Sequence, residues 1–269
     1  MKPFTFSLRG EPDQRLDCAA LVPHRLAGLG PAEIARIALN TTKQKITAGD
    51  AFHIRAGDLA AIRFEGGSER LDNIGEGLAA GALDVEGPVG KAAGRKMSGG
   101  RLTISGDAGP FAGSGLSGGR IEITGSAGDF LGGPFPGEMQ GMRGGLIVVR
   151  GRAGDRAGDR MRRGIIVIEK GSGDYVASRM IAGTLLVLGA TGRLPGYLMR
   201  RGSLLLREKP SLSPAFLPCG TFAFGFARLF ADSLKPESRA AARLLKGSFE
   251  RYAGDMSVLG KGEVLVAAD

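Results

Sequence analysis

The side chains in this sequence that could do chemistry are few and far apart. There are two histidines, His24 and His53, and two cysteines, Cys18 and Cys219, in 269 residues. A zinc or iron site needs three or four converging ligands, and neither histidine has a cysteine or an acidic cluster beside it in the sequence. The same scarcity leaves no Ser-His-Asp arrangement that could be defended. We therefore expect no metal ligand and no catalytic residue in this chain.

One segment imitates a nucleotide-binding motif. Residues 113–118, Gly-Ser-Gly-Leu-Ser-Gly, fit the pattern Gly-x-Gly-x-x-Gly. That pattern binds a dinucleotide when a strand precedes it, a helix follows it and an acidic residue lies about 20 positions further on. Here the segment lies inside a longer glycine repeat and leads into another predicted strand. We attribute the match to the abundance of glycine.

Positive charge is the strongest chemical signal. The net charge is +9, from 36 Lys and Arg against 27 Asp and Glu. In a stacked array, Arg162 would lie beside Arg143 and Arg160 beside Arg179, about 4.8 Å apart, and like charges this close repel unless an anion or a carboxylate-bearing surface faces them. Two interpretations stay open: a solvated face with Asp155 and Asp159 as local partners, or a contact with an acidic subunit or an anionic carrier. The candidate contact residues are Arg143, Arg160, Arg162, Arg163 and Arg179.

The composition weighs against several classes of protein. A basic chain first suggests nucleic acid, but three tyrosines, no tryptophan and no recognised binding motif argue against it. No run of 18 apolar residues and no apolar signal segment is present, so we expect neither membrane insertion nor secretion. Two cysteines are too few for a disulfide framework, and we expect a cytoplasmic protein.

A repeat running from Gly81 to Arg207 must position these side chains. Seven short aliphatic runs each open on a glycine, and these glycines lie 19 residues apart except for one interval of 26: Gly81, Gly100, Gly119, Gly145, Gly164, Gly183 and Gly202. The long interval holds seven extra residues between Gly132 and Met142, which we expect to form a loop. Between the runs a second pattern recurs, Gly-x-x-Gly-x-x-x-Gly-x-x-Met, as at Gly151, Gly154, Gly158 and Met161. A fixed period of this kind indicates a stacked array.

The length of the period predicts the fold. Nineteen residues at about 3.3 Å each trace at most roughly 60 Å, enough for one coil of a parallel β-solenoid with three short sides. We predict an all-β protein, a parallel β-helix with coils of about 19 residues over residues 76–208. A small α+β region, residues 1–75, would cap its N-terminal end. A strand and helix extension, residues 209–269, would pack on the solenoid.

Alternation within each run assigns the faces. We expect two aliphatic side chains of each run to point inward, with a column of five methionines filling the core. The central outward residue is polar in the first three runs (Asp84, Thr103, Glu122) and apolar in the last four (Val148, Val167, Leu186, Leu205). An apolar stripe four residues long must be covered by another segment or by a partner. We predict that residues 221–230, whose phenylalanines follow a two-residue spacing, form a strand over it, and that residues 236–246 form a helix.

The N-terminal region shows weaker patterns. We predict a helix over residues 31–40, which begins on a proline and ends on an asparagine. Strands are predicted over residues 45–47 and 51–55, and residues 62–66 resemble a shortened first run of the repeat.

The glycine and methionine spacing resembles a known family. The repeat is similar to the glycine-rich β-helix domain of the large subunit of glutamate synthase. The whole chain, with Tyr252-Ala253-Gly254-Asp255 and Gly260-Lys261-Gly262-Glu263 near its end, resembles the C subunit of formylmethanofuran dehydrogenase. The nearest variant is the formyltransferase/hydrolase complex of methylotrophic bacteria.

That resemblance implies a non-catalytic structural subunit. The complex moves a formyl group from formyl-tetrahydromethanopterin to a methanofuran-type carrier with a glutamate-rich tail and releases formate, using metal-binding and transferase residues on other subunits. It implies three partners, an amidohydrolase-like hydrolase subunit, a formyltransferase subunit and the B subunit, and a carrier tail that the arginines could contact. The alternatives are the C subunit of an archaeal-type formylmethanofuran dehydrogenase, and a free-standing β-helix enzyme or polyanion-binding protein.

Overall fold

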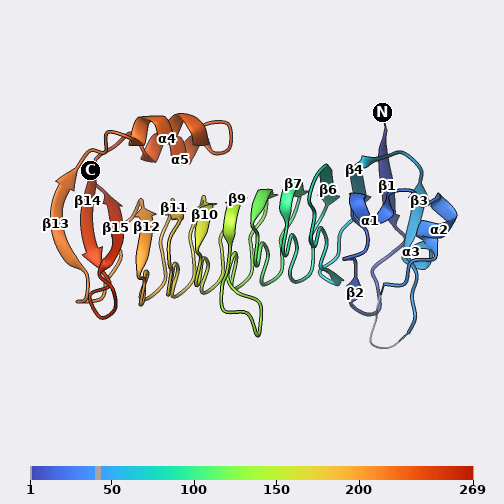
Figure 1. Cartoon of the computed structure of the whole chain (residues 1–269), viewed down its shortest axis with the longest axis horizontal. Helices are drawn as coiled ribbons and strands as arrows, with labels where there is room; N and C mark the ends of the chain where they lie inside the picture. Colours follow the sequence, from blue (N-terminus) through green and yellow to red (C-terminus); the bar gives the residue numbers. More distant parts are fainter. Residues whose placement is uncertain (1, 40–43, 269) are drawn as a thin grey trace.

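A computed structural model describes residues 2–39 and 44–268 of the chain. It is mostly β, as predicted, and its main feature is a 13-stranded sheet that does not close on itself (Figure 1). Seven central strands carry the repeat: β6 (Ala82–Glu86), β7 (Ser98–Ile104), β8 (Gly118–Ile123), β9 (Arg143–Val149), β10 (Arg163–Ile168), β11 (Thr184–Val187) and β12 (Arg201–Leu206).

The central strands are parallel, and equivalent residues of successive repeats are neighbours. Leu83 pairs with Leu102, and Leu102 pairs with Ile121. A second column of parallel bridges links Ala108 to Ala127 and Ala127 to Ala153 in the turns. Strands and turns therefore both stack with the period of the sequence. The seven extra residues form the predicted loop between β8 and β9, which projects from the row of turns (Figure 1).

The predicted faces of the strands are confirmed. The inward aliphatic side chains are buried, and so are the five methionines, each with no exposed surface: Met97, Met142, Met161, Met180 and Met199. The outward column also pairs in register, from Asp84 and Thr103 through Glu122 to Val148. The seven glycines that open the runs all have positive φ, a conformation that costs little only without a Cβ.

Aspartates join the turns of successive repeats. One oxygen of Asp129 accepts the backbone N–H of Asp155 at 2.8 Å, and one oxygen of Asp155 accepts that of Asp174 at 2.7 Å. The glycines at 90, 154, 173 and 192 lie against such carboxylates, and a Cβ on any of them would come within 2.3 Å of an aspartate oxygen. The close stacking of these turns therefore depends on the absence of a side chain.

The N-terminal region covers one end of the sheet. It contains β1 (Pro3–Leu8), β2 (Leu16–Asp17), α1 (Pro23–Leu26), α2 (Pro31–Ala35), α3 (Ala48–Ala51), β3 (Phe52–Arg55), β4 (Asp58–Glu65) and β5 (Leu71–Asp72). Strand β4 is parallel to β6, which confirms a first run of the repeat, but at eight residues this strand is not shortened as predicted. Beyond it, β1 is parallel to β4, and the edge strand β3 is antiparallel to β1. Strands β2 and β5 form a separate two-stranded sheet.

Two N-terminal predictions differ from the structure. The helix predicted over residues 31–40 ends at Ala35, and its predicted asparagine end lies outside the described residues. The strand predicted over residues 45–47 is reduced to one bridge between Thr47 and Ala38. The reason is local, because Thr47 and Asp50 form a capping box that starts α3.

The C-terminal region covers the opposite end and the apolar stripe. It contains β13 (Leu217–Phe222), α4 (Ala227–Leu234), α5 (Arg239–Leu244), β14 (Phe249–Gly254) and β15 (Lys261–Ala267). Strand β15 is parallel to β12, whereas β14 and β13 are antiparallel additions at the edge. Helices α4 and α5 lie along one side of the strands (Figure 1).

The stripe is covered by the chain itself, as one alternative predicted, but the covering element is helical. Residues of α4 and α5 form one buried cluster with Val148, Val167, Leu186 and Leu205. The strand predicted over residues 221–230 is confirmed only at Thr221 and Phe222, the last two residues of β13. From residue 227 on it is wrong, because Ala227, Ala231 and Leu234 follow helical spacing and are buried while Leu229 is 76% exposed. The predicted helix over residues 236–246 begins only at Arg239, where the Ser238 side chain caps it.

Candidate functional site

The groups most able to make or break bonds do not come together. Among residues 2–39 and 44–268, no three His, Cys, Asp or Glu side chains are placed to hold a metal ion. His24 and His53 are exposed, and His53 lies beside Arg9, with Nε2 3.3 Å from a guanidinium nitrogen. Burial raises the pKa of the Cys18 thiol, which opposes formation of the nucleophilic thiolate. The features of the described surface that could bind a partner are its exposed arginines and its hollows.

The same part of the chain contains no helix that is long and apolar enough to cross a membrane.

The candidate arginines gather where the turns enter the strands. Arg143 and Arg163 are the first residues of β9 and β10 and pair with each other in the sheet. The predicted pairing of Arg162 with Arg143 is therefore wrong, because the register shifts between Arg163 and Ile165. Arg143, Arg162 and Arg163 are exposed, and within the described residues none of them forms an ion pair.

Arg179 has a structural partner. Its Nε and Nη2 atoms donate to the two oxygens of Asp159 at 2.9 and 2.7 Å. Asp159 has no exposed surface and also accepts a 2.6 Å hydrogen bond from the Ser178 hydroxyl. A buried carboxylate needs this compensation, so the guanidinium of Arg179 neutralises a charge of its own chain.

Two hollows flank Met139 of the inserted loop. A groove of about 250 Å³ contains Arg160 and Arg179 and is lined by Met139, Arg160, Arg179, Ile181, Leu198, Arg200 and Val258. A neighbouring hollow of about 310 Å³ contains Arg143 and is lined also by Lys96, Gly115, Glu138, Met139 and Gln140. Sequence analysis identified the arginines as candidates but not Met139, Arg200 and Val258. These three residues lie beside the arginines only in the folded protein, where the inserted loop and the C-terminal turn come close to the repeat.

The inserted loop is held by ionic and aromatic contacts. Glu138 accepts a hydrogen bond from Arg95 at 2.7 Å and lies 3.4 Å from the ammonium group of Lys96. Phe135 packs edge-on against Phe111, and the guanidinium of Arg95 lies over the Phe135 ring. Burial alone would raise the pKa of Glu138, but the hydrogen bonds and charges of Arg95 and Lys96 outweigh it, and this pKa is lowered.

Acid should release this loop. A carboxylate with a lowered pKa stabilises the folded state at neutral pH, and that contribution is lost as the pH falls through the lowered pKa. We expect the amides of residues 133–141 to lose hydrogen-exchange protection on acidification before the strands do. In Glu138→Gln the protection should be weaker at neutral pH and should change less with pH.

Glu208→Gln is the matched control, because Glu208 is exposed and belongs to none of the contacts that hold the loop. Equal pH profiles for wild type and Glu138→Gln would contradict the assignment of Glu138 as the group that holds the loop.

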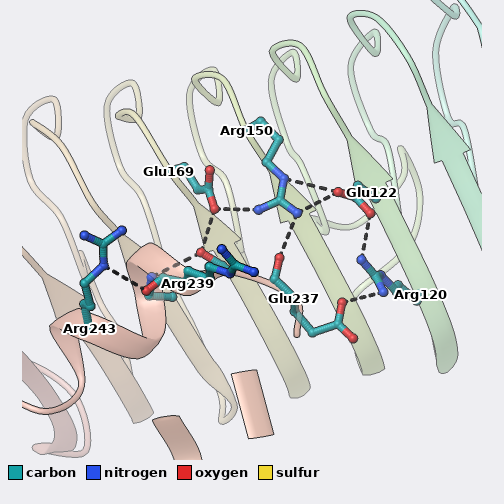
Figure 2. Close-up of polar contacts among 9 residues, drawn as sticks. Arg120, Glu122, Arg150, Glu169, Glu237, Arg239 and Arg243 are labelled. Carbon is teal, nitrogen blue, oxygen red and sulfur yellow. Dashed lines mark hydrogen bonds and ion pairs between the residues drawn. The ribbon is translucent and has the colours of Figure 1, made fainter. Parts of the chain in front are cut away.

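A second ionic network fastens the C-terminal helices to the strands (Figure 2). Arg150 donates to Glu122 and to Glu169, both at 2.6 Å, and to the backbone oxygen of Glu237 at 2.7 Å. Arg120 pairs with Glu122 at 2.7 Å and with Glu237 at 2.6 Å. Burial works to lower the pKa of Arg150, but the two glutamates outweigh it and the pKa is raised. Arg150 thus links the segment that leads into α5 to the strands.

The sequence contained a signal for this network. Arg150 and Glu169 are 19 residues apart, as are Glu76 and Arg95, and each is an ion pair. Opposite charges separated by one period occupy equivalent places in adjacent repeats. A search of the sequence for opposite charges 19 residues apart would have identified Arg150 as ion-paired. It would thereby have distinguished Arg150 from the exposed arginines in the same basic stretch of sequence.

Comparison with known proteins agrees with this architecture. The family model described as the GXGXG motif matches residues 70–212. The stacked repeat and its contact surfaces define a glycine-repeat β protein.

Two relatives specify the family. The C subunit of the formyltransferase/hydrolase complex Fhc of Methylorubrum extorquens (strain AM1) is 52% identical over 264 residues, covering 98% of this chain and 99% of that protein. A chain in the crystal structure of the formyltransferase/hydrolase complex FhcABCD from Methylorubrum extorquens, in complex with methylofuran, matches with a TM-score of 0.94 at 45% identity, covering 98% of this chain and 100% of that chain. The chain belongs to the family of the C subunits of formyltransferase/hydrolase complexes.

Proposed function

We propose that this chain is a structural subunit of a formyltransferase/hydrolase complex. The observation that carries the proposal is the match along the full length of both chains, at 52% identity, to the C subunit of such a complex. The reaction is the transfer of a formyl group from formyl-tetrahydromethanopterin to a methanofuran-type carrier and its release as formate. Its chemistry belongs to the companions, an amidohydrolase-like hydrolase subunit, a formyltransferase subunit and the B subunit. The carrier and the metal ions are held there.

The proposed architecture is a parallel β-solenoid with coils of about 19 residues. The in-register parallel strands and the second column of bridges in the turns support it. Residues 76–208 are its coils, residues 1–75 its N-terminal cap, and residues 209–269 a C-terminal extension that covers the apolar stripe. A winding of this kind presents several flat sides, which suits a subunit that others dock against. Two free cysteines, one of them exposed, fit a reducing cytoplasm.

The candidate arginines would contact an acidic companion or the glutamate-rich tail of the carrier. Arg143, Arg162 and Arg163 are the strongest of the five for this role, because all three are exposed and none pairs with a carboxylate in the described part of the chain. Hydrogen bonds between a guanidinium group and a carboxylate are short and strong because both groups are charged. The alternative of an archaeal-type dehydrogenase subunit has less support, because the relative at 52% identity is from a formyltransferase/hydrolase complex.

Native purification from the source organism tests the function. We expect the chain to be recovered with three companion subunits in equal amounts and with formyltransferase/hydrolase activity. An Arg162→Glu/Arg163→Glu variant should retain less carrier or fewer companions than wild type. Recovery of the wild-type chain as a lone monomer would contradict the proposed function. Normal assembly and normal carrier content in the double variant would contradict only the role of these two arginines.

A further inference from the structure

The groove beside Met139 has an apolar interior open to solvent. Ile181 and Leu198 line it from the turns of the repeat, Met139 from the inserted loop and Val258 from the turn between β14 and β15. Met139 is 73% exposed and Val258 is 40% exposed. Large apolar side chains that gather at an exposed groove mark a contact site.

Fixed contacts hold both walls of the groove. On one side, Glu138, the neighbour of Met139, is bound to Arg95 and Lys96. On the other side, Asp255 is buried, and its carboxylate accepts the backbone N–H of Leu198 at 3.0 Å and that of Ser257 at 2.8 Å. The groove is therefore formed before anything binds in it, which reduces the ordering cost of binding.

Positive charge borders the apolar interior. Among the described residues, Arg160 and Arg200 form no ion pair, and the guanidinium group of Arg160 lies 3.8 Å from the sulfur of Met139. Arg179, which also lines the groove, is neutralised by Asp159. Two guanidinium groups beside an apolar surface fit carboxylates placed on either side of an apolar side chain.

We propose that this groove is the docking site of a companion subunit, which inserts one large apolar side chain flanked by acidic residues. The inference rests on the proposed function and names the surface and the chemistry of one interface. A second copy of the chain fits less well, because a chain of net charge +9 would bring like charges together at the same arginines. A free polyanion would satisfy Arg160 and Arg200 but leave Met139 and Val258 exposed to water. A buried apolar anchor with a charged rim is the usual arrangement of an interface hot spot.

The test uses the whole complex, co-expressed with a tag on this chain. Met139→Asp places a carboxylate where the apolar side chain would enter, and Arg160→Glu reverses the charge of the rim. We expect each variant to lower the recovery of at least one companion subunit per tagged chain by tenfold or more. The matched controls are Leu29→Asp, an exposed apolar residue of the N-terminal region, and Arg152→Glu, an exposed arginine of another turn. Both controls should assemble like wild type.

Each other outcome has a distinct meaning. If both groove variants assemble like the controls, the docking site is wrong while the proposed function stands. If wild type itself recovers no companion, the proposed function and the docking site both fail. Loss of carrier without loss of a subunit would assign the groove to the anionic carrier and overturn the inference. Loss of self-association, measured by light scattering of the isolated chain, would assign the groove to a second copy and overturn it too.

Folding of the variants is checked by thermal melting. If Met139→Asp melts below wild type, Val258→Asp replaces it, because that residue enters the groove from the opposite wall. Normal recovery of all companions with a folded Val258→Asp variant would equally overturn the inference.

Discussion

Replacing Gly173 by alanine should destabilise the protein by about 3 kcal/mol or more, at the upper end of the cost of overpacking. An added Cβ would lie 2.1 Å from an oxygen of Asp155 and 2.9 Å from both the Asp155 nitrogen and the Gly154 carbonyl carbon. The backbone of the preceding turn cannot move away without separating the stacked repeats. Displacing the carboxylate would also break its 2.7 Å hydrogen bond with the backbone of Asp174. Urea unfolding, followed by circular dichroism, measures the loss.

The control for this variant is Gly10→Ala. An added Cβ at Gly10 has no atom within 4 Å, and the residue does not have positive φ. We expect its unfolding midpoint to differ little from that of wild type. Equal midpoints for Gly173→Ala and Gly10→Ala would show that the turns can separate at low cost, contrary to the packing described above.

Replacing Arg179 by methionine should cost about 3 kcal/mol. The change leaves the buried carboxylate of Asp159 with only Ser178 as a side-chain partner, and breaking a buried ion pair from one side costs about 3–5 kcal/mol. We expect the lower end of that range because the Arg179 side chain is 34% exposed. The additional change Asp159→Asn removes the stranded charge, and the double variant should be more stable than Arg179→Met alone. Chemical unfolding of the isolated chain provides the measurement.

Arg193→Met is the matched control for this second prediction. Arg193 pairs with Asp174 at 2.7 Å, but its side chain is 83% exposed, and surface pairs of this kind contribute about 0–1 kcal/mol. If Arg179→Met proves no more costly than Arg193→Met, the pair with Asp159 does not stabilise the fold. The guanidinium of Arg179 would then be free to serve a partner, as the sequence first suggested.

The repeat could be predicted from the sequence because the same physical requirement recurs in every copy. A glycine at each corner and two inward aliphatic residues in each run recur often enough to define both the register and the buried face. The pairing of Leu83, Leu102 and Ile121 follows directly from the 19-residue period. The apolar outward column also predicted that something must cover it.

The C-terminal cover could not be predicted in detail because residues 209–269 lie outside the repeat. Alternating phenylalanines suggested a strand, whereas the buried side of α4 is made mostly of alanines, which carry a weak hydrophobic signal. The partner of Arg179 was missed for a related reason. Asp159 lies 20 residues from Arg179, one more than the repeat period. The residue one full period away is Arg160, so sequence analysis paired Arg179 with a like charge.

Only the arginines of the candidate groove could be predicted from the sequence, and its apolar residues could not. The arginines were conspicuous, but Met139 and Val258 are 119 residues apart and come together only when the loop and the last turn fold onto the repeats. Long-range contacts of this kind leave no periodic pattern. Their geometry depends on two single polar residues, Glu138 and Asp255, and the sequence does not show which residues these two contact.

The reversal of strand direction at both ends of the sheet limits growth. A parallel stack of equivalent rungs could in principle accept the first rung of another molecule on its last and extend into a fibre. Here the terminal strands β3 and β13 belong to antiparallel pairs, and β13 contains Pro218, which has no N–H to donate to a further strand. The length of the stacked sheet is therefore set by the number of repeats in the sequence and not by how many molecules are present.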